Sequence, residues 1–394
     1  MTATLEENST LGILSDLIAF DTTSFRSNMS LIDYVVSYLD RDNIQVEVIK
    51  NAEGTKANLF ATIGESQNPG IILSGHTDVV PVEGQNWATD PFKLRIEDNK
   101  AFGRGTCDMK GFIASVLAAV PKMAQENLAC PVHIALSYDE EVGCVGVRHL
   151  IDFLKHKNLE VEACIIGEPS SLKPVTAHTG KHVFRCAFQG TAMHSSLAPG
   201  GVNAISYAAG ILSEINYLEK IAESYVIDDT RFEYPHPTIN IGKITGGKAV
   251  NIVAEHCQFD VECRYPPGSS PTFFTDALPG IVKTMAHEPM YLKSPAAYAS
   301  CEQVTEYPAF EGDFNSPAAQ LVRRLTGSNG DYAVNYGTEA GLFQTSGYSS
   351  VVCGPGDINQ AHQPDEFIEL SQLSACDKMM DTLIREFSLE EVSA

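Results

Sequence analysis

Basic residues are scarce in this sequence. The 394 residues include 27 Lys and Arg against 50 Asp and Glu, which gives a formal net charge of −23 at pH 7. Proteins that bind nucleic acid without regard to its sequence neutralise phosphates with a basic surface. The scarcity therefore argues against a nucleic-acid partner and favours a cationic partner or a metal ion.

Long apolar runs are also missing. No apolar run approaches the roughly 18 residues that a membrane-spanning helix needs. The first residues, MTATLEENSTLGILSDLIAF, are acidic where a signal peptide would be basic. We therefore expect no membrane segment, and a cytoplasmic protein that is not exported.

Closely spaced cysteine pairs are absent as well. The 10 cysteines are scattered along the chain without a CxxC motif. This usage is typical of reduced thiols in a cytosol, and it argues against a disulfide framework or a zinc knuckle. Most of these cysteines are expected to act as small core hydrophobes.

The first part of the chain alternates between helical patterns and short apolar strands. This alternation indicates an α/β sheet covered by helices on both faces. The predicted elements are helices at 11–18 and 31–39, strands at 44–50, 58–64 and 70–75, a helix at 109–127 with a kink at Pro121, a strand at 132–138, a helix at 146–157 and a strand at 163–167.

The pattern changes after residue 180. A strand at 181–190, a helix at 203–223, strands at 238–244 and 251–265 and a helix near 273–286 predict a small antiparallel sheet with two helices, an α+β unit of ferredoxin-like kind. The first pattern then resumes with a helix at 317–326, a strand at 349–354 and a helix at 370–387. We therefore predict a discontinuous α/β domain of residues 1–180 and 291–394, interrupted by a domain of residues 181–290.

Metal-ligating residue types follow the predicted strands where these end. In open α/β sheets the carboxyl ends of the strands form the crevice in which ligands bind. Two histidines and three carboxylates can fill the shells of two zinc ions if one carboxylate bridges them. The candidates are His76, Asp108, Glu140, Glu141, Glu168 and His362.

The adjacent pair Glu140 and Glu141 suggests a division of work, because one carboxylate can ligate while the other takes the proton of an attacking water. Asp78 would share a strand face with the histidine at position 76 if the strand persisted, and its carboxylate would then orient that ring. Each residue alone also has an ordinary interpretation. Asp108 would cap its helix, and His362 would be an exposed loop residue.

Five motifs in order, LSGHTDVVP, GRGTCDMKG, YDEEVG, GEPS and AHQPDEF, resemble the M20 family of metallohydrolases with two metal ions. The resemblance extends over essentially the whole chain. A dinucleotide-binding loop is a weaker interpretation of GRGTCD, because Asp108 stands where the third glycine belongs. Membership of this family would imply a metal-dependent amidohydrolase with two Zn²⁺ per chain, Co²⁺ being a possible substitute, and a small N-acyl amino acid as substrate.

The resemblance also implies which residue would bind which ion. His76 and Glu168 would bind one zinc ion, and Glu141 and His362 would bind the other. Asp108 would bridge the two ions. The inserted domain would serve as a lid and would form a homodimer.

Further roles follow from the same resemblance. Glu140 would be the general base, and Asp78 would orient the first histidine ligand. His194, in GTAMHSS, would stabilise the oxyanion across the dimer, although it also fits an ordinary loop residue. Asn251 and Arg264 would contact the substrate, and Arg264 fits a structural ion pair on the sheet equally well.

The segment YGTEAGLFQ, at 336–344, resembles the acetylornithine deacetylases of this family more than the succinyl-diaminopimelate desuccinylases. Glu339 would attract the ammonium group of N2-acetyl-L-ornithine and repel a succinyl carboxylate, or alternatively cap the helix that follows. The predicted reaction releases acetate and L-ornithine, a step of arginine biosynthesis. A desuccinylase, a broad aminoacylase or a dipeptidase would share every ligand, and a non-catalytic binding protein is the alternative from another class.

Overall fold

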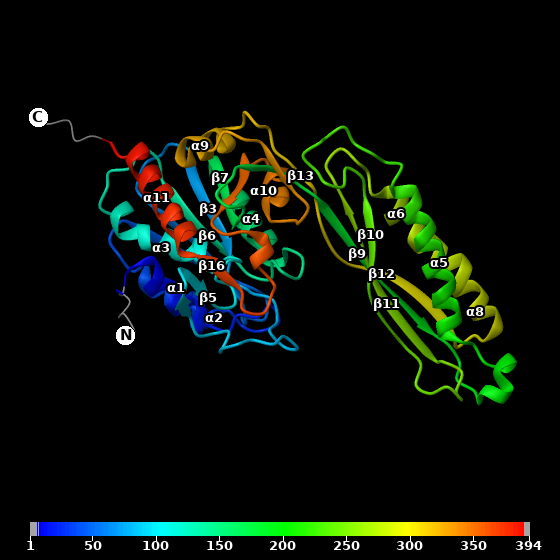
Figure 1. The fold of residues 1–394 in the computed structure, drawn as a ribbon. Helices are drawn as coiled ribbons and strands as arrows, with labels where there is room; N and C mark the ends of the chain where they lie inside the picture. Colours follow the sequence, from blue (N-terminus) through cyan, green and yellow to red (C-terminus); the bar gives the residue numbers. More distant parts are fainter. Residues whose placement is uncertain (1–5, 7, 390–394) are drawn as a thin grey trace, which may run out of the picture. The chain divides into compact units, whose positions relative to one another are not determined.

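The computed structural model describes residues 6 and 8–389, and the chain divides into two compact units (Figure 1). Unit 1 runs from the start of the described chain to Ala177 and includes residues 311–333 and 338 onward, while unit 2 comprises His178–Phe310 and Val334–Gly337. Residues 1–5 and 7, which contribute to the argument against a signal peptide, lie outside the described part. None of the helices described there combines the length and apolar character needed to cross a membrane.

The helices and strands predicted for unit 1 are present, with shifts of a few residues at their ends. Its elements are α1 (Thr10–Ala19), α2 (Met29–Tyr38), β1 (Ile44–Lys50), β2 (Ala57–Ile63), β3 (Gly70–His76), β4 (Arg95–Glu97), β5 (Lys100–Phe102), α3 (Lys110–Met123), β6 (Val132–Ser137), α4 (Val145–His156), β7 (Val161–Pro169), β8 (Val175–His178), β13 (Phe310–Glu311), α9 (Pro317–Thr326), β14 (Tyr332–Val334), α10 (Ala340–Thr345), β15 (Ser350–Gly354), η3 (Ile358–Gln360), β16 (Phe367–Glu369) and α11 (Leu370–Phe387). Helix α3 continues through Pro121, the residue at which we predicted a kink, and ends at Met123.

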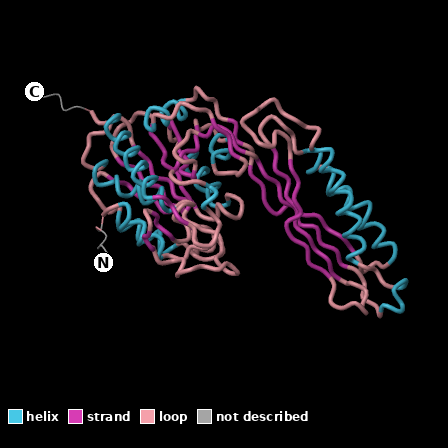
Figure 2. Tube along the Cα trace, viewed as in Figure 1, coloured by secondary structure: helices cyan, strands magenta, loops and turns pink. Residues whose placement is uncertain are grey.

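The main sheet of unit 1 is mixed, in the order β1-β2-β6-β3-β7-β15-β8-β13. Strands β6, β3, β7 and β15 run parallel, so their carboxyl ends lie at one edge. Every residue of β3 is buried, as expected for a strand covered on both faces. Helices flank the sheet (Figure 2). Ile71 and Leu73 join the core formed with α1, α3 and α11, and α4 covers the other face, where Phe153 contacts Phe60. The predicted α/β architecture is confirmed.

Unit 2 is an antiparallel sheet in the order β10-β11-β9-β12, packed against helices. Its elements are β9 (Gly180–Gln189), η1 (Ser195–Gly200), α5 (Ala204–Ala222), β10 (Thr238–Gly246), β11 (His256–Tyr265), α6 (Thr272–Thr275), α7 (Ala277–Val282), η2 (Lys283–His287), α8 (Glu288–Lys293) and β12 (Tyr298–Tyr307). The strand predicted from residue 251 begins only at His256, and the helix predicted near 273–286 consists of several short segments that reach Lys293.

The predicted boundary at residue 290 differs from the structure, because the second unit extends to Phe310. The cause is β12, which pairs with β9 along its whole length and was not predicted. Among its residues only Ala299 and Tyr307 are buried, so the sequence YASCEQVTEY carries little of the apolar alternation that marks a strand. Pairing with a neighbouring strand, and not side-chain burial, places this segment in the sheet.

Buried His133 makes the stability of unit 1 depend on pH. Its ring stacks on Phe60, and its Nδ1 lies 3.0 Å from the Thr62 hydroxyl. Burial lowers the pKa of His133 to about 4. His133 therefore takes up a proton at higher pH in the unfolded chain than in the folded one. The stability that the neutral, buried ring contributes is present above about pH 6.5 and is lost as the pH falls toward 4.

We expect His133→Gln to remove part of the acid sensitivity of folding, since glutamine does not titrate and can still bond to Thr62. The fall in the free energy of unfolding between pH 7 and pH 5 should shrink by about 2 kcal/mol. Urea unfolding at the two pH values measures this, with exposed His156→Gln as the matched control. If the free energy of unfolding fell equally between the two pH values in His133→Gln and in the parent, the role of the buried histidine would be contradicted.

Candidate metal centre

Five potential ligands come together at the carboxyl edge of the parallel strands. His76 ends β3, Glu168 lies near the end of β7, and Asp108 immediately precedes the turn into α3. Glu141 follows β6 and His362 follows β15. They form two groups, His76 with Asp108 and Glu168, and Asp108 with Glu141 and His362, and in each group the ligand atoms lie within 4.8 Å of one another.

Asp108 is shared by both groups. Its Oδ1 lies 2.9 Å from Nε2 of His76, and its Oδ2 lies 3.1 Å from Nε2 of His362. The side chain does not cap α3, whose N-cap residue is Met109 and which has no side-chain capping bond. One oxygen thus faces each histidine, which is the arrangement that a bridging carboxylate requires.

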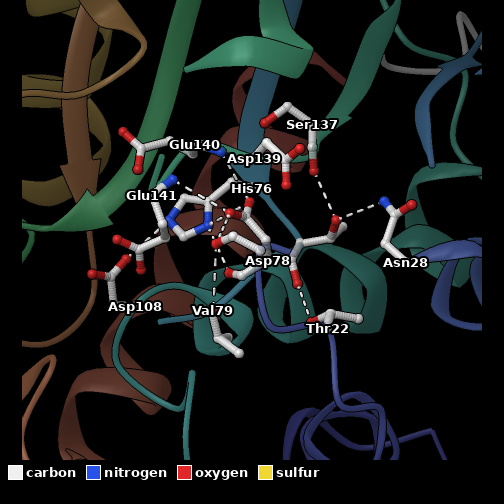
Figure 3. A network of polar contacts seen from close by, with 12 residues as sticks. Thr22, Asn28, His76, Asp78, Val79, Asp108, Ser137, Asp139, Glu140 and Glu141 are labelled. Carbon is white, nitrogen blue, oxygen red and sulfur yellow. Dashed lines mark hydrogen bonds and ion pairs between the residues drawn. The ribbon is translucent and has the colours of Figure 1, made fainter. Parts of the chain in front are cut away.

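The remaining carboxylates complete each group. Glu168 Oε1 lies 3.6 Å from Nε2 of His76, and Glu141 Oε2 lies 3.1 Å from Nε2 of His362 (Glu141, His76 and Asp108 appear in Figure 3). His76, Asp108 and Glu168 are almost fully buried, whereas the side chain of His362 is 48% exposed. The centre is therefore enclosed on the side of β3 and accessible on the side of His362.

The charges of the cluster indicate that it suits cations. Burial and the neighbouring Asp108 raise the pKa of Glu168 to about 8. Burial lowers the pKa of His362, but Asp108 and Glu141 outweigh it and raise that pKa to about 11. The carboxylates thus stabilise positive charge on the imidazoles, and a divalent ion in each group would supply the same charge. Imidazole nitrogens with carboxylate oxygens are also the ligands that zinc takes, so the donor set fits two such ions.

Asp78 differs from the prediction in how it orients His76. Strand β3 ends at His76, so Asp78 lies beyond the strand and the two do not share a strand face. Nδ1 of His76 donates instead to the backbone carbonyl of Asp78 at 2.9 Å, and the Asp78 carboxylate is 3.6 Å away. Nδ1 therefore keeps its proton, and Nε2, which faces the carboxylates of Asp108 and Glu168, is the atom that can ligate an ion.

The Asp78 carboxylate has a second structural task. It accepts hydrogen bonds from the Ser24 hydroxyl at 2.8 Å and from the backbone N–H groups of Glu140 and Glu141 at 3.1 and 3.3 Å (Figure 3). Asp78 therefore holds the segment that carries both glutamates. Ser24 was not predicted, since no motif surrounds it.

The two adjacent glutamates point to different partners. Glu141 approaches His362, whereas Glu140 Oε1 accepts from the Cys144 thiol at 3.3 Å and belongs to neither ligand group found among the described residues. Burial, followed by the nearby Glu168, raises the pKa of Glu140 well above its usual value. The pair therefore separates into one potential ligand and one carboxylate beside the ligands.

The predicted residues of unit 2 have local contacts within that unit. Nδ1 of His194 accepts from the backbone N–H of Ser196 at 3.2 Å, which leaves Nε2 as the donor atom of the ring. His194 pairs with Ile252, beside Asn251, so these two loops lie together. Arg264 forms an ion pair with Glu262 at 3.1 Å, in agreement with the structural alternative for this residue.

Glu339 is buried inside unit 1, with 1% of its surface exposed. Its carboxylate accepts from the hydroxyls of Ser137 and, at 3.4 Å, Ser74, which lie on β6 and β3. It stands at the N-cap of α10 without a side-chain capping bond, so the alternative interpretation as a cap is wrong. Burial raises the pKa of Glu339 to about 7.

Three further polar residues around the centre were not predicted, although they stand inside the quoted motifs. Lys110 is buried and donates to the backbone carbonyls of Leu17 and Phe20 at 3.0 and 2.9 Å, which ties α3 to the end of α1. Arg104 and Glu366 form a buried ion pair, and Glu366 accepts from the backbone N–H of Asp108. Their position next to predicted ligands was the signal that could have identified them.

Comparison with known proteins identifies a family and named relatives. The profile of Peptidase family M20/M25/M40 matches residues 72–386. The acetylornithine deacetylase of Pasteurella multocida is 35% identical over 388 residues, which cover 96% of this chain and 97% of that protein. The acetylornithine deacetylase of Photorhabdus laumondii is 34% identical over 372 residues, 94% of each chain.

Solved structures share the fold. Human carnosine dipeptidase 1 superposes with a TM-score of 0.73 at 16% identity, covering 96% of each chain. A tripeptidase from Staphylococcus aureus gives a TM-score of 0.68 at 20% identity, covering 97% of this chain and 100% of that one. The YXEP protein of Bacillus subtilis, described as a dinuclear metal binding peptidase, gives 0.60 at 16% identity, covering 96% of this chain and 97% of that one. At these identities the likeness concerns the fold alone.

Proposed function

The chain belongs to Peptidase family M20/M25/M40 and is a metal-dependent amidohydrolase, and on this basis we propose that it converts N2-acetyl-L-ornithine to L-ornithine and acetate. The observation that carries the proposal is the pair of ligand groups sharing Asp108. Relatives named acetylornithine deacetylase, at 34–35% identity over more than nine-tenths of both chains, support the substrate. This activity would place the protein in arginine biosynthesis.

The proposed centre holds two Zn²⁺ ions, for which Co²⁺ can substitute. His76 and Glu168 would hold one ion, Glu141 and His362 would hold the other, and Asp108 would serve both. Such ions, when bound, would supply Lewis acidity that polarises the acyl carbonyl and lowers the pKa of the attacking water. The dinuclear site described for the YXEP protein, which shares the fold, is consistent with this proposal.

Glu140 performs the proton transfers in the proposed mechanism. Its carboxylate takes a proton from the attacking water and returns it to the nitrogen of the departing amine. Asp78 assists because its carboxylate accepts the backbone N–H of Glu140 and so holds that residue in place. The ligands of the two ions therefore stay fixed while a neighbouring carboxylate moves the proton.

Unit 2 supplies the proposed lid and the homodimer contact. His194, whose Nδ1 accepts from the backbone N–H of Ser196, donates its Nε2–H to the oxyanion across the dimer. Asn251 and Arg264 contact the substrate, and Arg264 would exchange part of its pairing with Glu262 for the α-carboxylate. Glu339 provides the negative charge for the substrate's ammonium group.

A panel of three substrates tests the proposed function. Zinc-loaded protein is assayed with N2-acetylornithine, N-succinyl-diaminopimelate and N-acetylmethionine, beside protein stripped by a chelator. We expect metal-dependent hydrolysis with the highest kcat/KM for N2-acetylornithine. Preference for either other substrate would retain the metal centre but overturn the substrate assignment.

Glu339→Gln distinguishes a specificity role from a structural one. If the Glu339 charge meets the substrate ammonium, kcat/KM for N2-acetylornithine should fall at least about tenfold, because hydrogen bonds to charged groups contribute about 1.5–3 kcal/mol. N-Acetylmethionine has no ammonium group and should be affected much less. An equal loss for both substrates would show that Glu339 acts only through Ser74 and Ser137.

A further inference from the structure

The carboxylate of Glu366 binds the backbone of the segment that carries Asp108. Its Oε1 accepts hydrogen bonds from the N–H groups of Cys107 and Asp108, at 2.9 and 3.1 Å. These N–H groups precede α3 and take no part in its internal hydrogen bonds, so they need another acceptor. Glu366 therefore fixes the backbone from which the Asp108 side chain extends.

Arg104 holds the other oxygen of the same carboxylate. Its Nη1 lies 2.6 Å from Oε2 of Glu366, and both side chains are 1% exposed. The guanidinium also bonds to the amide oxygen of Gln85 and lies 5.0 Å from the ring centroid of Trp87. A buried carboxylate so close to Asp108 would repel it, and Arg104 compensates that charge.

The same network reaches the histidine of the second ligand group. Nε2 of Gln85 donates to the backbone carbonyl of His362 at 2.9 Å, and Nη1 of Arg104 approaches the carbonyl of Gln363 at 3.4 Å. His362 itself has a left-handed backbone, with φ of 59°, and lies on a loop. Three segments distant in sequence, around Gln85, Asp108 and His362, are thus joined through one buried ion pair.

We propose that Arg104 and Glu366 are positioning residues that set the placement of Asp108 relative to His362, and thereby the affinity for the ion that these two residues hold with Glu141. This inference rests on the proposed two-ion function. Neither side chain contacts a ligand atom of the cluster; both act through the backbone of the ligand segments. Removing the polar support of metal ligands typically lowers metal affinity about 10- to 100-fold.

The test measures Zn²⁺ binding to Glu366→Gln by titrating stripped, folded protein against a competing chelator. The matched control is Glu369→Gln on the adjoining strand β16, where Glu369 forms a surface pair with Lys100 at 3.5 Å. We expect the affinity for one of the two ions to fall about 10- to 100-fold in Glu366→Gln and both affinities to remain unchanged in Glu369→Gln. Unchanged Zn²⁺ affinity in Glu366→Gln would overturn the proposal, even if the stripped variant is less stable.

If Glu366→Gln does not fold, Arg104→Lys replaces it in the same Zn²⁺ titration. Lysine keeps the charge facing Glu366 but lacks the planar fork that also reaches Gln85 and Gln363. We expect a loss of Zn²⁺ affinity in Arg104→Lys, and parental affinity would overturn the inference. A parent protein that binds fewer than two Zn²⁺ would overturn the two-ion function together with the inference, whereas two ions bound equally well by parent and variants would overturn the positioning role alone.

Discussion

Glu140→Gln protein is expected to bind both metal ions and to turn over N2-acetylornithine about 100- to 10,000-fold more slowly than the parent. Glutamine has nearly the shape of glutamate but cannot accept the proton of the attacking water. Glu140 belongs to neither ligand group, and its carboxylate accepts from the Cys144 thiol. Its loss should therefore leave the ligand cluster intact.

The adjacent glutamate provides the matched comparison. Glu141 lies 3.1 Å from His362 and belongs to a ligand group, so Glu141→Gln should lose metal as well as activity. Metal content by atomic emission and kcat for the two variants separate the roles. Loss of metal in Glu140→Gln, or retention of its turnover, would show that the assignment of Glu140 as the base is wrong.

Asp108→Ala is expected to abolish the binding of both ions and all measurable hydrolysis. Because Asp108 is the residue common to the two groups, its removal deprives each group of a ligand at once. It also leaves His76 and His362 without the carboxylate that faces both rings. No other single ligand substitution should affect both ions to this extent.

Thermal unfolding with and without Zn²⁺ measures this effect independently of catalysis. A ligand that binds only the folded state stabilises it by about 2.7 kcal/mol at a concentration of 100 times Kd. Zn²⁺ should therefore raise the Tm of the parent and not that of Asp108→Ala, while His362→Ala should retain one ion and part of the shift. Two ions bound by Asp108→Ala would rule out the bridging role.

Local sequence signals determined most of the helices and strands. Helix α9 has the bounds that its sequence predicts, because Ser316 caps its start and Gly327, in a left-handed conformation, ends it. An apolar run likewise identified β3, because a strand that is buried on both faces is apolar along nearly its whole length. Strand β12 is the counterexample, since only its pairing with β9 makes it a strand.

The sequence by itself determined the residue types, the motif order and the strand ends at which ligand candidates stand. Tertiary structure alone decided that Asp108 faces two histidines, that the backbone carbonyl of Asp78 meets the His76 ring, and that Arg104 pairs with Glu366. Strand and helix signals arise from neighbours a few residues apart. Contacts between segments far apart in the chain depend on how the sheet is ordered, and no local pattern records that order.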